Sequence, residues 1–122
     1  MSKINHHLSN KKRRSLRVHH RVQATKDQPK LVITRSNKSI YLQVINYQGQ
    51  IITSDSDHAL IKAGKIKNKL TKTQKAQQAG ESLAGKLKKQ KIKKLAIDRG
   101  ANKFHGRIKA AVEALRENGV EA

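Results

Sequence analysis

Three short segments in the first half of the chain have the apolar pattern of β-strands. Residues 31–34 are apolar and mostly β-branched, and residues 51–54 have a similar composition. Between them, residues 40–45 alternate, so that Ile40, Leu42 and Val44 would share one face of a strand. Only short polar turns separate the three segments. Because connections of this length join antiparallel neighbours, the pattern predicts a three-stranded antiparallel meander.

Apolar residues recur at helical spacing in the next part of the chain. Asp55 and Asp57 are typical of a helix start, and they predict a short helix followed by a basic loop at residues 62–69. Thr71 and Gln74 then match a capping box, which opens a longer helix. The apolar stripe of this helix is rich in small residues and predicts close packing on the sheet. The stripe comprises Ala76, Ala79, Leu83, Ala84 and Leu87, with Gly80 and Gly85 nearby.

The last part of the chain predicts a strand, a tight turn and a helix. Residues 95–98 are short and largely apolar, a polar turn follows, and residues 108–115 return to helical spacing before Gly119, a typical helix stop. The order is then a basic N-terminal segment followed by βββαβα. A crossover through the long helix allows the fourth strand to pair in parallel, so we expect an α/β domain with a mixed sheet.

The net charge directs attention to a polyanionic partner. The 122 residues include 28 Lys and Arg against 8 Asp and Glu, which gives a formal net charge of +20. A free globule with this charge would repel itself, so nucleic acid is the first candidate partner. A membrane surface is the weaker candidate, because the most basic segment has few bulky apolar residues opposite its cations. We expect no transmembrane span, no signal peptide and, without cysteine, no disulfide or thiolate metal site.

Residues 1–29 form a basic arm, and Pro29 marks the entry to a folded domain at residues 30–122. The segment from Lys11 to Arg21 has no Pro or Gly, so it is able to become helical once phosphates neutralise its charge. In isolation we expect it to be disordered. The paired histidines at 6–7 and 19–20 have no carboxylate or cysteine beside them, and we expect no metal there.

The strand, turn and helix near the C-terminus are better suited to binding an anion than to catalysing a reaction. A helix that begins directly after a tight turn presents free backbone N–H groups, and this turn adds Arg99, Lys103, Phe104, His105 and Arg107. The βββαβα order also occurs in ribonuclease-H-like enzymes, which need several carboxylates around metal ions. Only Glu81 and Asp98 are available on the relevant elements, and Asp98 is better explained as an ion pair or a turn cap. We therefore expect no catalysis, no cofactor and no small-molecule substrate.

RNA is the favoured polyanion, and a nucleoid-type DNA-binding protein is the alternative. Two of the three aromatic residues, Tyr41 and Phe104, lie close to basic residues, where they are able to stack on unpaired bases. Arginine side chains in the turns suit bidentate contact with phosphate. DNA compaction would explain the charge but gives no reason for a mixed sheet with two polar turns.

Two segments resemble a known family. Residues 35–45 (RSNKSIYLQVI) and 98–110 (DRGANKFHGRIKA) are similar to the signature segments of the 5S rRNA-binding protein of the bacterial large ribosomal subunit, the eighteenth by traditional numbering. The resemblance covers the whole chain, including the basic arm, the Lys-rich loop and the ending at residues 116–119. It implies a three-layer, ribonuclease-H-like α/β domain without catalysis, located in a cytoplasmic or organellar ribosome.

The resemblance further implies that the protein attaches 5S rRNA to 23S rRNA in the central protuberance, beside other large-subunit proteins. The arm would grip RNA backbone, and the two signature segments would form the contact of the folded domain. Together, the residues and the resemblance give one set of expected RNA-binding residues. The set comprises Lys11, Lys12, Arg13, Arg14, Arg17, Arg21, Arg35, Ser36, Asn37, Lys38, Tyr41, Gln43, Lys67, Lys69, Arg99, Phe104, His105, Gly106 and Arg107.

Overall fold

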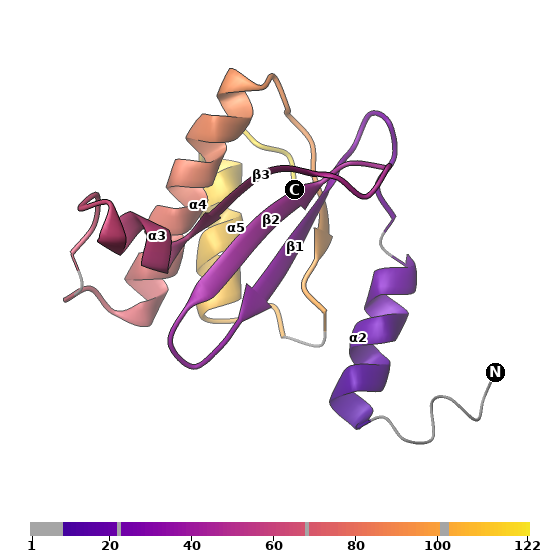
Figure 1. Cartoon of the computed structure of the whole chain (residues 1–122), viewed down its shortest axis with the longest axis horizontal. Helices are drawn as coiled ribbons and strands as arrows, with labels where there is room; N and C mark the ends of the chain where they lie inside the picture. The colour runs from indigo at the N-terminus through magenta and orange to yellow at the C-terminus, as the bar shows by residue number, and fades with distance from the viewer. Residues whose placement is uncertain (1–8, 22, 68, 101–102) are drawn as a thin grey trace.

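The computed structural model describes residues 9–21, 23–67, 69–100 and 103–122. Its elements follow the predicted order, with one helix in the basic arm and one short helix before the long one (Figure 1). The elements are α2 (Asn10–Arg21), β1 (Lys30–Arg35), β2 (Ile40–Ile45), β3 (Ile51–Ser56), α3 (Asp57–Lys62), α4 (Lys72–Lys89), β4 (Ala96–Asp98) and α5 (Arg107–Glu117).

The four strands form one mixed sheet in the order β3-β2-β1-β4. β1 pairs with β2 and β2 with β3 in antiparallel fashion, which confirms the predicted meander. β4 returns beside β1 and pairs with it in parallel, so that Lys30 lies opposite Ala96 and Val32 opposite Asp98. This parallel pair confirms the predicted crossover, and it brings the turn after β4 to the same edge of the sheet as the turn after β1.

One hydrophobic core joins the sheet to α4 and α5. The alternating residues Ile40, Leu42 and Val44 of β2 are fully buried, as their pattern predicts, together with Leu83 of α4 and Leu115 of α5. The mixed α/β arrangement is confirmed and is consistent with a ribonuclease-H-like motif.

Two of the three expected layers pack through this core. They are the sheet and the layer of α4 and α5, which lie side by side (Figure 1). Thr34 and Tyr41 stay exposed on the opposite face of the sheet. None of the α2 side chains that the structure describes belongs to the core, and the sequence of this helix is almost entirely polar.

The long helix begins as predicted, and a glycine beside its apolar stripe contacts α5. The Thr71 hydroxyl accepts a hydrogen bond from the Gln74 N–H, and the Gln74 side chain accepts one from the Thr71 N–H, which completes the capping box. All five residues of the predicted stripe are buried in the core that includes the sheet, whereas Gly80, beside the stripe, approaches α5. A Cβ on Gly80 would lie 2.4 Å from the carbonyl oxygen of Ala111, so this glycine allows α4 and α5 to touch.

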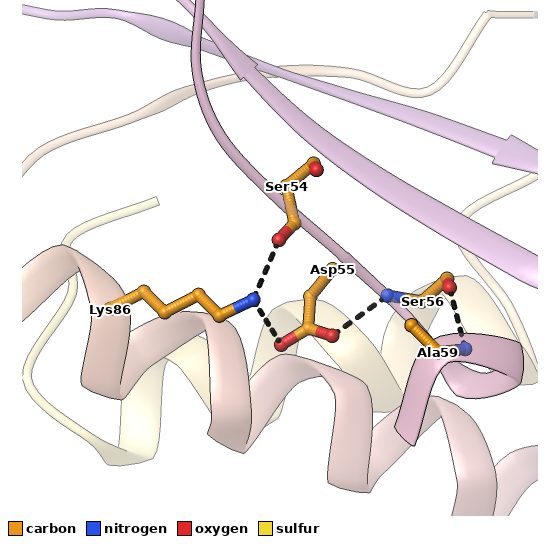
Figure 2. Close-up of polar contacts among 5 residues, drawn as sticks. All are labelled: Ser54, Asp55, Ser56, Ala59 and Lys86. Carbon is orange, nitrogen blue, oxygen red and sulfur yellow. Dashed lines mark hydrogen bonds and ion pairs between the residues drawn. The ribbon is translucent and has the colours of Figure 1, made fainter. Parts of the chain in front are cut away.

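β3 extends two residues further than predicted, because its last residues bind α3 and α4. Ser56 belongs to the strand and also caps α3, accepting a hydrogen bond from the Ala59 N–H. The buried Asp55 accepts a hydrogen bond from the Ser56 N–H and lies 3.4 Å from the Lys86 ammonium of α4 (Figure 2). Lys86 also donates to the Ser54 carbonyl oxygen, so this polar cluster fastens the edge strand to the helical layer.

Candidate nucleic-acid interface

The turn between β1 and β2 is held in shape by Ser36. Its hydroxyl accepts hydrogen bonds from the Lys38 N–H at 3.3 Å and the Ser39 N–H at 3.2 Å. Its own N–H donates to the Ser39 carbonyl oxygen at 2.9 Å. A serine that bonds to the backbone two and three residues ahead is a standard way to fix a tight turn. The turn therefore presents Arg35, Asn37 and Lys38 from a defined backbone.

Arg107, the first residue of α5, reaches this turn from the other end of the chain. Its side chain is buried, with 9% of the residue exposed, and its Nη2 donates to the Ser36 carbonyl oxygen at 2.7 Å. The second terminal nitrogen, Nη1, is buried and has no hydrogen-bond partner among the described residues. A buried, charged donor without a partner is costly unless an anion satisfies it.

The start of α5 adds a second reason to expect an anion. Gly106 is the N-cap residue, and it provides no side chain to accept hydrogen bonds from the first N–H groups of the helix. No acidic residue occupies the first turn, so the positive end of the helix dipole is not compensated there. Gly106 has φ 58° and ψ −123°, a conformation that residues with a Cβ rarely adopt. Gly106 thus allows the chain to enter α5 beside the β1–β2 turn.

Five residues from three parts of the chain line a pocket of about 370 Å³ at this place. Three of the five carry a positive charge, none is acidic, and the wall is mostly polar. The β1–β2 turn and the start of α5 lie at the same end of the domain, toward which the N-terminal end of α2 also points (Figure 1). The lining residues are Lys11, Arg35, Ser36, Asn37 and Arg107. All five belong to the expected RNA-binding set.

Asp98 shapes the turn that leads from β4 toward α5. It is fully buried, its Oδ1 accepts a hydrogen bond from the Gly100 N–H at 3.1 Å, and its Oδ2 lies 3.6 Å from the Lys30 ammonium. Asp98 is both the turn cap and the ion-pair member that the sequence predicts, but Lys30 was not foreseen as its partner. Lys30 and Asp98 come from adjacent parallel strands, which only the sheet register brings together.

The two aromatic candidates lie on different elements. Tyr41 is 42% exposed on the open face of the sheet, and Phe104 is 37% exposed in the turn before α5. The Arg116 guanidinium lies 5.6 Å from the centre of the Phe104 ring, a cation–π contact that sequence reasoning missed. The Tyr41 ring is therefore exposed on the sheet face, whereas the Phe104 ring is already in contact with the Arg116 guanidinium of α5.

The remaining expected residues lie around the pocket or apart from it. Lys38, His105 and the arm residues Lys12, Arg14 and Arg17 are exposed, while Arg13, Gln43 and Arg99 are partly buried. Arg21 ends α2, and its side chain lies outside the described residues, as do those of both histidine pairs. Lys67 and Lys69 are exposed in the loop between α3 and α4, which the cartoon draws at the opposite side of the domain from α2 (Figure 1).

Comparison with known proteins identifies the family of the whole chain. Residues 5–122 match the family model described as "Ribosomal L18 of archaea, bacteria, mitoch. and chloroplast". The chain belongs to this family. It is 37% identical over 115 residues to large ribosomal subunit protein uL18 of Kosmotoga olearia, and 39% identical over 111 residues to that of Lactiplantibacillus plantarum, covering 91% of both chains in each case. It is also 38% identical over 101 residues to uL18c of Gracilaria tenuistipitata var. liui, covering 83% of this chain and 96% of that one.

Family membership confirms several expectations. The family consists of structural ribosomal proteins, so the chain is not an enzyme, although its element order also occurs in enzymes. Its members act in the ribosome, which is cytoplasmic in bacteria, and the family also includes chloroplast forms. In the described part of the chain, no helix is both long and apolar enough to cross a membrane.

Proposed function

We propose that this chain binds 5S rRNA and helps to attach it to 23S rRNA in the central protuberance of the large ribosomal subunit. Family membership makes it a structural constituent of that subunit, in contact with rRNA and neighbouring ribosomal proteins. The finer assignment to 5S and 23S rRNA rests on the signature segments at residues 35–45 and 98–110. The observation that carries it is the buried, unpartnered Nη1 of Arg107 in a cationic pocket.

A phosphate group of 5S rRNA fits the pocket in charge and in donors. Arg107 contributes its free N–H group, Lys11 and Arg35 contribute further charge, and the start of α5 contributes backbone N–H groups. Because Nη2 is already bonded to the Ser36 carbonyl oxygen, the guanidinium is held in place before RNA arrives. Less side-chain entropy is therefore lost on binding than with a free arginine.

We further propose that residues 1–29 act as an RNA-binding arm on a domain at residues 30–122. The exposed Lys12, Arg14 and Arg17 of α2 would contact phosphates that continue from the pocket, which Lys11 of the same helix lines. Such contacts depend on charge and not on base sequence, so they add affinity without adding specificity. The arm is then the part that extends from 5S rRNA toward 23S rRNA.

Base contacts would come from the open face of the sheet and from the turn before α5. Tyr41 stands among the polar residues Thr34 and Gln43, which is a suitable surface for an unpaired base. Phe104, with Arg116 on its ring, offers a combined aromatic and cationic surface. Lys67 and Lys69, in their separate loop, would contact more distant backbone.

The test is the binding of a 5S rRNA transcript by the purified chain and by Arg107→Ala. We expect the substitution to weaken binding by about 1–3 kcal/mol, or roughly fivefold to 150-fold, because a charge-assisted contact is lost. Arg107→Lys keeps the charge but not the planar fork, so its affinity should lie between the two. Lys72→Ala removes one exposed charge outside the pocket and serves as the control.

Circular dichroism separates loss of RNA contact from loss of folding, since Arg107 also bonds to Ser36. Unchanged binding by a folded Arg107→Ala protein would remove this residue from the interface. Competition by duplex DNA tests the alternative of a nucleoid-type DNA-binding protein. If duplex DNA displaced 5S rRNA at equal nucleotide concentration, the proposed selectivity would be refuted.

A further inference from the structure

A lysine-rich segment lies at the other end of α4 and α5 from the pocket. Residues 86–94 contain six lysines and no acidic residue. Two of them have partners, since Lys86 pairs with Asp55 and Lys94 lies 4.0 Å from the Glu121 carboxylate. The other four are exposed and form no ion pair within the described part of the chain. We name these four residues the lysine patch: Lys88, Lys89, Lys91 and Lys93.

The lysine patch borders a hollow between the ends of the two helices. The hollow has a volume of about 490 Å³, and most of its wall is apolar. Ile92 and Val120 contribute apolar side chains, and three members of the patch line it together with Asn118 and Gly119. The hollow therefore combines an apolar floor with a cationic rim. This combination suits a nucleotide, which has a flat base face that packs on apolar surface and a charged phosphate nearby.

The backbone at Lys91 shows that the fold alone does not favour lysine there. Lys91 has φ 60°, and no other described non-glycine residue has a positive φ. It directly follows the C-cap of α4, where the Ile92 N–H returns to the Leu87 carbonyl oxygen at 3.0 Å. Glycine or asparagine is usual at this left-handed position after a helix. A lysine that occupies an unfavourable backbone position suggests a use for its charge.

The attraction between lysines and the negative end of a helix does not account for the whole patch. It explains Lys88 and Lys89, which lie in the last turn of α4. Lys91 and Lys93 lie beyond that turn, where the attraction to the negative end of the helix is weak. The nearby acidic residues of α5 and the C-terminal segment are Glu117 and Glu121, too few to balance the lysines.

α5 separates the patch from the pocket. The helix begins with Arg107 in the pocket and ends at Glu117 beside the hollow, a length of about 16 Å for its 11 residues. Figure 1 shows the β1–β2 turn and the end of α4 at opposite ends of the domain. An RNA strand held by the pocket would have to bend around the helical layer to reach the patch. Two separate RNA strands could occupy the pocket and the patch without such a bend.

We propose that the lysine patch binds a second RNA segment through its phosphates, so that the folded domain bridges two RNA segments. An RNA strand fits better than an acidic protein segment, because phosphates recur regularly along it and the patch presents four cations without ion-pair partners within residues 88–93. Lysines without arginine or aromatic neighbours hold backbone and do not read bases. The inference rests on the proposed function only in assigning the pocket to 5S rRNA.

The experiment starts from an equimolar complex of the full chain with 5S rRNA. A fluorescent 12-nucleotide oligouridylate serves as the second RNA, and its capture is followed by anisotropy at several salt concentrations. The patch variant is Lys88→Gln, Lys91→Gln, Lys93→Gln. The matched control, Lys62→Gln, Lys72→Gln, Lys109→Gln, removes three exposed charges that are scattered over the surface. We expect the patch variant to lose capture about tenfold relative to the control, with a salt slope smaller by about 2.

Binding of 5S rRNA alone distinguishes this inference from the proposed function. Both variants should bind 5S rRNA equally, within about twofold. If the control lost capture as much as the patch variant, or if the wild-type complex captured no oligouridylate, the second site would be refuted and the pocket would remain. Binding of a Glu-rich peptide in place of oligouridylate would overturn the RNA assignment in favour of a protein partner.

The variant Lys91→Gly tests the role of Lys91 in RNA capture without destabilising the fold. Glycine relieves the left-handed backbone, so we expect this variant to unfold at a higher temperature while capturing less oligouridylate. A protein that is more stable and binds RNA less well cannot be explained by partial unfolding. Undiminished capture by Lys91→Gly would contradict the role of Lys91 in the patch.

Discussion

At the residue scale, a single missing side chain sets the distance between α4 and α5. Gly80 faces the backbone of α5, where an added Cβ would lie 2.4 Å from the Ala111 carbonyl oxygen and 3.0 Å from the Ala114 Cβ. Backbone atoms of a packed helix cannot move aside cheaply. We therefore expect Gly80→Ala to lower the free energy of unfolding by about 1–3 kcal/mol, measured by urea denaturation.

Gly85 provides the matched control in the same helix. It lies within α4, it is exposed, and an added Cβ would meet nothing within 4 Å. Alanine favours the helix over glycine, so Gly85→Ala should raise the free energy of unfolding by about 0.5–1 kcal/mol. Equal effects of the two substitutions would contradict the close contact at Gly80.

The pair of Lys86 and Asp55 allows a second prediction at this scale. Asp55 is buried, and its Oδ2 has no hydrogen-bond partner among the described residues, so the Lys86 ammonium at 3.4 Å balances its charge. Lys86→Met should lower the free energy of unfolding by about 1–3 kcal/mol, because it leaves a buried carboxylate without its counter-ion.

A double substitution tests the cause of that loss. Adding Asp55→Asn to Lys86→Met removes the unpaired charge, so the double variant should recover part of the stability in the same urea experiment. Strictly additive losses would mean that the two residues do not interact, and the contact drawn in Figure 2 would then be incidental.

Individual residues could be predicted from the sequence only where a local motif names them. Arg107 was expected in the interface because it lies in a signature segment, and Ser36 because it lies in the other. The bond between them joins residues 71 positions apart, and no periodicity reports such a contact. The same applies to Arg116 over Phe104 and to Lys30 beside Asp98. The sequence could suggest which residues contact RNA. It could not show which of their donor atoms are left without a hydrogen-bond partner in the protein.

At the element scale, sequence patterns predicted most of the secondary structure because the signals are local. Alternation revealed β2, and the capping box revealed the start of α4. The contact of Gly80 with α5 could not be predicted, because an apolar stripe shows that a face is buried but not against what. The sheet register that brings β4 beside β1 likewise depends on long-range contacts.

The helical arm gives a prediction that concerns a whole element. α2 has a dense positive charge, and none of its described side chains belongs to the core. Deletion of residues 1–26 should therefore leave the domain folded, as judged by its unfolding transition. It should also reduce the slope of log affinity for 5S rRNA against log salt concentration, because fewer phosphates are neutralised. A slope equal to that of the full chain would show that the arm makes no contact with the RNA.

At the scale of the whole molecule, a net charge of +20 makes the free protein sensitive to anions. Repulsion among 28 cations destabilises the compact state, so any added salt should stabilise the fold to some degree. A specific pocket adds a separate effect, because an anion that binds only the folded state stabilises it by mass action. The two effects are separable by comparing anions at constant ionic strength.

Inorganic phosphate should therefore stabilise the wild-type chain more than chloride does, and the excess should disappear in Arg107→Ala. With a dissociation constant on the order of 1 mM, 10 mM phosphate would contribute about 1.4 kcal/mol, equivalent to a rise in Tm of about 5–6 °C for a chain of this size. Lys72→Ala, with one charge fewer outside the pocket, should keep the excess. If phosphate and chloride stabilised all three proteins alike, the charge would act only as a diffuse field, and the buried Nη1 of Arg107 would not be an anion-binding group.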